Sequence, residues 1–144
     1  MTMKPRAFSL LIVLVLVVVG VAGCATFPSD SARLQGTWTG PDTAPNRLGN
    51  CTLIVSGASL EFRGSDANEW YRGSFVLNEK AAPKQLVVTI TDCSAPQLVG
   101  KAGNAIYKFD GGTLTVTGRT PGKPGFPSQF GEANAQTVAF TKAR

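Results

Sequence analysis

The residues of this chain that could carry chemistry are three cysteines, scattered carboxylates and a few aromatic rings, because the chain has no histidine. Without histidine, neither a Ser-His-Asp nor a Cys-His catalytic group can form. Asp66 and Glu69 are close in sequence, but they fit a solvated turn better than the shared cleft that a general acid and base need. Neither Cys51 nor Cys93 has the Cys-x-x-Cys partner of a metal site. We therefore predict no catalytic residue, no metal and no cofactor. The alternative is an enzyme, and two carboxylates that converge in a cleft would indicate one.

Cys24 stands at the end of an N-terminal targeting pattern. Two basic residues precede an apolar stretch, residues 7–22, and small residues lead into the cysteine. This order is typical of a secretory signal. The stretch Val-Ala-Gly-Cys resembles the lipobox of bacterial lipoproteins. The resemblance implies that a diacylglyceryl group is attached to the thiol, that the chain is cut just before Cys24, and that the new N-terminus is acylated as well.

The resemblance gives residues 1–23 as a signal peptide and Cys24 as the lipidated residue. Two or three acyl chains hold a protein stably on a membrane, so we expect the domain to be anchored on the periplasmic or outer face of the cell membrane. Ala25, in place of Asp after the cysteine, favours the outer membrane in a cell that has one. The alternative is an uncleaved transmembrane helix, because no charge lies between Arg6 and Asp30 and such a length can span a bilayer.

Cleavage before Cys24 would leave Cys51 and Cys93. Two cysteines in an oxidising compartment usually pair, so we expect a disulfide between them, with two buried free thiols as the alternative. Cleavage also lowers the formal net charge from +5 to +3, because it removes two basic residues and no acid. The densest positive loop, residues 119–125, holds only two cations, which does not predict nucleic-acid binding.

Alternation of apolar and polar residues dominates the chain after the signal and predicts strands. An Asp110-Gly111 turn, which favours a tight hairpin, separates two of them. We predict a flexible tether over residues 24–32 and one all-β domain over 33–144, a small antiparallel barrel of about eight strands, with a sandwich as the alternative. No helical period is present, so no helix is expected to cap the barrel. The predicted strands are 34–40, 51–57, 59–63, 69–79, 85–91, 105–110, 113–118 and 137–143.

Several short motifs suggest a family. Leu-Gln-Gly-Thr-Trp, residues 34–38, resembles the opening strand of lipocalin-like barrels. In order, the chain then has Pro83-Lys84, Ile106-Tyr107, a Gly-Gly turn before a leucine strand, and Pro-x-x-Phe at 127–130. Together these are similar to an uncharacterised bacterial family of small lipocalin-like domains. Gly112 and Phe126 depart from that family, which often has Asp and Arg there. The resemblance implies a fold and no catalytic residue.

We expect a non-enzymatic, monomeric envelope lipoprotein with either a filled barrel or a small apolar ligand in the barrel mouth. Aromatic side chains bury large areas and can line a ligand cavity. The candidate ligand-binding residues are Trp38, Tyr71, Phe75 and Tyr107. The alternative is a protein-binding envelope module, an inhibitor or assembly accessory, that uses the Pro- and Gly-rich loop 118–135.

Overall fold

The structure of the protein is a computed structural model that describes residues 23, 24 and 26–144. The predicted signal peptide, apart from Gly23, lies outside the described residues. Within the described part of the chain, no helix has the length and apolar character needed to cross a bilayer.

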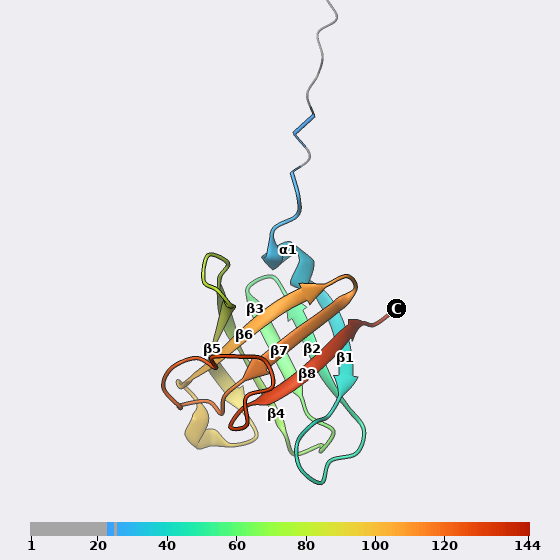
Figure 1. Ribbon diagram of the computed structural model, residues 1–144. Helices are drawn as coiled ribbons and strands as arrows, with labels where there is room; N and C mark the ends of the chain where they lie inside the picture. The colour runs from blue at the N-terminus through green and yellow to red at the C-terminus, as the bar shows by residue number, and fades with distance from the viewer. Residues whose placement is uncertain (1–22, 25) are drawn as a thin grey trace, which may run out of the picture.

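Eight antiparallel strands form a closed barrel in which each strand pairs with its sequence neighbours and β8 pairs back with β1 (Figure 1). The prediction of a small lipocalin-like β-barrel is confirmed, and the sandwich alternative is wrong. Closure leaves no open sheet edge. The elements are α1 (Asp30–Leu34), β1 (Gly36–Pro41), β2 (Asn50–Ser56), β3 (Ser59–Arg63), β4 (Trp70–Asn78), β5 (Lys84–Cys93), the 3-10 helix η1 (Pro96–Leu98), β6 (Ala102–Asp110), β7 (Thr113–Gly118) and β8 (Gln136–Lys142).

Burial follows the alternation seen in the sequence. In β2 every second residue is buried, namely Cys51, Leu53 and Val55, because successive side chains of a strand point to opposite faces. The other strands add inward rows of the same kind, and together they form one core.

Two glycines allow the strands to approach closely. A Cβ atom at Gly40 would lie 2.4 Å from the carbonyl oxygen of Ala139 on β8, and one at Gly73 would lie 2.2 Å from the carbonyl oxygen of Thr89 on β5. A real side chain does not fit at such distances. Glycine is therefore required at Gly40, where β1 meets β8 to close the barrel, and at Gly73, where the β4–β5 register shifts.

A helix that the sequence did not predict closes one end of the barrel. The predicted tether runs through residue 32, whereas the single helical turn of α1 already begins at Asp30. The Ser29 hydroxyl accepts a hydrogen bond from the Ala32 amide at 3.2 Å and caps this turn. The side-chain amide of Gln35 ties the turn to Gly57 on the β2–β3 connection through two hydrogen bonds. We call this the closed end; the loops 42–49, 64–69, 94–101 and 119–135 surround the opposite, open end.

Asp30 holds α1 in place through a buried network. Its carboxylate, 6% exposed, accepts hydrogen bonds from Lys84 Nζ at 2.6 Å and from the Tyr107 hydroxyl at 2.9 Å. Arg33 lies 3.5 Å from the same carboxylate, and the Asp30 amide donates to the Glu79 carboxylate at 3.0 Å. Burial alone would raise the pKa of Asp30, but the hydrogen bonds and positive charges more than offset it and hold the pKa below its ordinary value of 3.8.

The predicted disulfide between Cys51 and Cys93 is wrong. Both residues are buried, and both are free. Cys51 lies on β2 and Cys93 on β5, so β3 and β4 stand between them. Three inter-strand spacings amount to roughly 14 Å along the wall, about twice the largest Cα separation that a disulfide bridges. The alternative of two buried thiols holds for this structure.

We predict that Asp30→Asn lowers the free energy of unfolding at pH 7 by about 1–3 kcal/mol, because it removes a buried charge that accepts charge-assisted hydrogen bonds. The folded-state pKa is depressed, so the stabilisation is fully present above pH 3.8 and is lost as the pH falls through the lower folded value. Urea unfolding between pH 3 and 7 measures the difference. Asp92→Asn, at a side chain that is 60% exposed, is the control and should change stability little. Equal pH dependence of wild type and Asp30→Asn would contradict the assignment.

For the cysteines we predict that iodoacetamide modifies both Cys51 and Cys93 after denaturation without any reductant. In the folded protein Cys51 should resist modification at pH 8, because burial, together with the nearby charges of Asp42 and Glu69, raises the pKa of its thiol to about 12, and the thiolate is the reactive form. Intact mass counts the added groups. If both cysteines stay unmodified in the denatured, unreduced chain, the result would contradict the assignment of two free thiols.

Candidate functional site

A cavity of about 500 Å³ occupies the barrel interior and opens between the loops of the open end. Leu34 of α1 is among the residues that line it, so the closing helix contributes to the same cavity. The wall is apolar and comes from the inward rows of several strands; it includes Leu53, Leu60, Phe62, Leu86, Val88 and Val116. An apolar cavity of this size is in the range of small-molecule sites, and an eight-stranded barrel is just wide enough to hold one small ligand.

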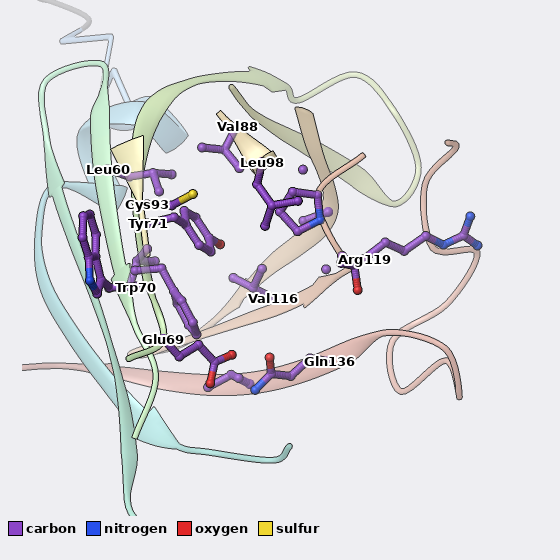
Figure 2. A pocket seen from close by; sticks show the side chains of 18 of the residues that line it. Leu60, Glu69, Trp70, Tyr71, Val88, Cys93, Leu98, Val116, Arg119 and Gln136 are labelled. Carbon is purple, nitrogen blue, oxygen red and sulfur yellow. The ribbon is translucent and has the colours of Figure 1, made fainter. Parts of the chain in front are cut away.

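Tyr71 and Cys93 bring polar atoms to this apolar wall. They are Cα partners across β4 and β5, and the Tyr71 ring points into the cavity (Figure 2). Burial, and then the negative charge of Glu69, raises the pKa of the Tyr71 hydroxyl to about 12, and no hydrogen bond within the described residues contributes to the shift. The Cys93 thiol already donates to the Ala95 carbonyl at 2.7 Å. The Tyr71 hydroxyl is therefore a neutral group that can donate one hydrogen bond to a ligand.

The rim of the cavity is polar and balanced in charge. Arg47 lies 3.3 Å from a carboxylate oxygen of Asp66 and 3.1 Å from one of Glu69. Arg119 pairs with Glu132 at 3.0 Å, and its side chain extends away from the cavity in Figure 2. Each arginine at the rim already has a carboxylate partner, so the mouth does not present an unbalanced charge to an ionic ligand.

The four aromatic residues predicted to bind a ligand do not form one site. Tyr71 lines the cavity, whereas Trp38, Phe75 and Tyr107 are buried elsewhere in the core. Trp38 Nε1 donates to the Leu34 carbonyl at 2.8 Å, and Tyr107 donates to Asp30, so both belong to the closed end rather than to the mouth. Burial and the hydrogen bond to Asp30 raise the pKa of Tyr107. Cys24 is exposed.

Several lining residues were not predicted. Val88 follows the inward alternation of β5, so the sequence pattern could have indicated it. Cys93 is out of phase with that alternation and turns inward after the register shift between β4 and β5, which the pattern does not predict. Arg47, Leu98 and Arg119 come from loops and η1, where no periodicity indicates which side chains turn toward the cavity.

Catalytic groups are sparse around the cavity. Glu69 is the one carboxylate among the described residues that line it, and both Glu69 and Asp66 contact Arg47. The paired carboxylates of the enzyme alternative are therefore not found in this cavity. Within the described part of the chain, no group of three or more Cys, Asp or Glu side chains is placed to hold a metal ion.

Comparison with known proteins adds no relative to this picture. No protein-family model matches the chain, and neither a curated protein nor a solved structure matches it.

Proposed function

We propose that this protein is a lipoprotein of a bacterial cell envelope that holds a small, predominantly apolar ligand in its barrel. The observation that carries the ligand proposal is the cavity of about 500 Å³, with its apolar wall and its opening at one end. An interior filled by its own side chains, the other possibility for a small barrel, would leave no such space. The anchoring part rests on the lipobox resemblance at Cys24, and the exposed position of this residue is compatible with modification.

The cavity also supports a description of the ligand. Its wall favours an apolar body, and the Tyr71 hydroxyl offers one hydrogen bond near the mouth. Because Arg47 and Arg119 are both paired, we expect an uncharged or weakly polar molecule rather than a strongly anionic one. Burial of a polar group without a partner is costly, so a ligand with one acceptor close to Tyr71 should bind better than a pure hydrocarbon.

Protein binding through residues 118–135, the alternative predicted above, would use the same mouth. Arg119, Thr120 and Pro121 line the cavity, and the Arg119–Glu132 pair ties the two ends of the loop together. A partner bound to this loop would cover the opening. The two functions are therefore expected to compete, and a true partner should slow the exchange of a cavity ligand.

Val88→Phe should abolish ligand binding, because Val88 is buried in the cavity wall and a phenyl ring fills the space. The mature protein, in nanodiscs of zwitterionic lipid, is titrated with N-phenyl-1-naphthylamine, an uncharged probe whose emission rises in apolar surroundings; empty nanodiscs give the background. We expect saturable binding by the wild type and at least a tenfold loss in Val88→Phe. The intact mass of the same preparation reports the acyl groups on Cys24.

Val76→Phe is the matched control. Val76 lies on the outer face of the neighbouring strand and is 67% exposed, so the same substitution adds the same ring outside the cavity and should leave binding unchanged. Tyr71→Phe removes only a hydroxyl and should weaken displacement of the probe by 1-octanol roughly fivefold. Wild-type signal equal to that of empty nanodiscs would overturn the ligand proposal, and an unmodified Cys24 would overturn the anchor.

A further inference from the structure

The net charge is distributed unevenly along the barrel axis. The half of the domain at the closed end carries six basic and three acidic side chains, a net charge of +3. The loops of the open end carry four of each sign, and the remaining four charged residues, on β3, β4 and β5, also balance. All of the net positive charge from residue 24 onward is therefore at one end. The six basic residues there are Arg33, Lys80, Lys84, Lys108, Lys142 and Arg144.

Four of these cations are exposed and are not part of any ion pair within the described residues: Lys80, Lys108, Lys142 and Arg144. Arg33 and Lys84 are occupied by Asp30, which is buried beneath them. Exposed carboxylates at this end are Glu79 and Asp110, fewer than the cations. A shallow hollow of about 310 Å³ lies between Arg33, Lys84 and Lys108, and no carboxylate lines it. A phosphate group there would meet Lys108, which has no ion-pair partner within the described residues, whereas Arg33 and Lys84 already pair with Asp30.

The tether leaves the barrel at this same end. Residues 26–29 run outward from α1 (Figure 1), and Cys24 precedes Asp30 by six residues, which span at most about 20 Å when fully extended. Phe27, 91% exposed, lies within this short segment. An aromatic ring at such a position is suited to the interface between lipid and water. An anchor at Cys24 would keep the closed end close to the membrane surface.

We infer that the closed end is a membrane-contacting surface that rests on anionic phospholipid and turns the mouth of the barrel away from the bilayer. The inference rests on the proposed lipid anchor. Basic side chains near a membrane are attracted to anionic headgroups over about one Debye length, and only the closed end has the charge for this. It follows that the cavity exchanges its ligand with the aqueous compartment, and not with the membrane to which the protein is tied.

Lysine footprinting tests the orientation. The mature protein is reconstituted in vesicles of phosphatidylcholine with or without one third phosphatidylglycerol, and is methylated with formaldehyde and dimethylamine borane, two neutral reagents that a surface potential does not repel. We expect modification of Lys80, Lys108 and Lys142 to fall at least threefold on the anionic vesicles, and this protection to disappear in 1 M salt. Lys101 and Lys123, which are exposed on the open-end loops, serve as internal controls and should react equally on both vesicles.

Matched charge reversals supply the second test. Lys80→Glu with Lys142→Glu changes the net charge of the closed end from +3 to −1 and should abolish the protection of Lys108. Lys101→Glu with Lys123→Glu changes the net charge by the same amount at the open end and should leave that protection intact. Equal effects of the two double variants, or protection of Lys101 and Lys123 instead, would overturn the orientation. If Cys24 is acylated and the cavity binds its probe but no lysine is protected, this inference fails while the proposed function stands; an unmodified Cys24 overturns both.

Discussion

The buried carboxylate of Asp30 is the interaction on which the arrangement of this barrel depends. A helix of five residues has no stability of its own in water, so α1 stays in place because of what it binds. Asp30 joins it to β5 through Lys84 and to β6 through Tyr107, and Gln35 joins it to the β2–β3 connection. These bonds place Leu34 in the core, 1% exposed. Because Leu34 also lines the cavity, these bonds fix the position of part of the cavity wall.

The aromatic residues at the closed end and those at the open end make different contacts. At the closed end Trp38 and Tyr107 are both buried and hydrogen-bonded to α1 residues, and they pack around Phe109 with ring centroids about 6 Å away. At the open end Tyr71 stacks on Phe62 at 5.2 Å and keeps its hydroxyl in the cavity. The Tyr71 hydroxyl makes no hydrogen bond within the described residues, so it is available to a molecule in the cavity; the buried side-chain atoms left without a hydrogen bond belong to Arg47 and Glu69, which pair with each other at the rim.

Strand positions could be predicted from the sequence because alternation is a local property: residues 51–57, 59–63 and 85–91 were predicted as strands, and the alternating apolar residues of β2, β3 and β5 are buried. The disulfide was predicted from the number of cysteines alone. The predicted strand order argues against it, because an up-and-down barrel puts two strands between Cys51 and Cys93. The Ser29 cap was visible in the sequence, but a single turn is too short for a helical period. Three of the four predicted ligand residues do not line the cavity, because an inward position does not indicate at which end of the barrel, or at which depth, a side chain lies.

The two ends of the domain also differ in their net surface charge. Under the proposed function, a cavity mouth that admits an apolar molecule gains nothing from unbalanced charge, and each arginine at the rim has a carboxylate partner. Positive charge is instead located where α1 closes the core, so it does not affect the mouth. Asp30 links the two roles, because the ion pairs that keep the end closed also occupy Arg33 and Lys84. The outward charge therefore depends on Lys80, Lys108, Lys142 and Arg144, which form no ion pair within the described residues. Lys142 also contacts the closing helix, because its Nζ donates to the Arg33 carbonyl at 3.4 Å.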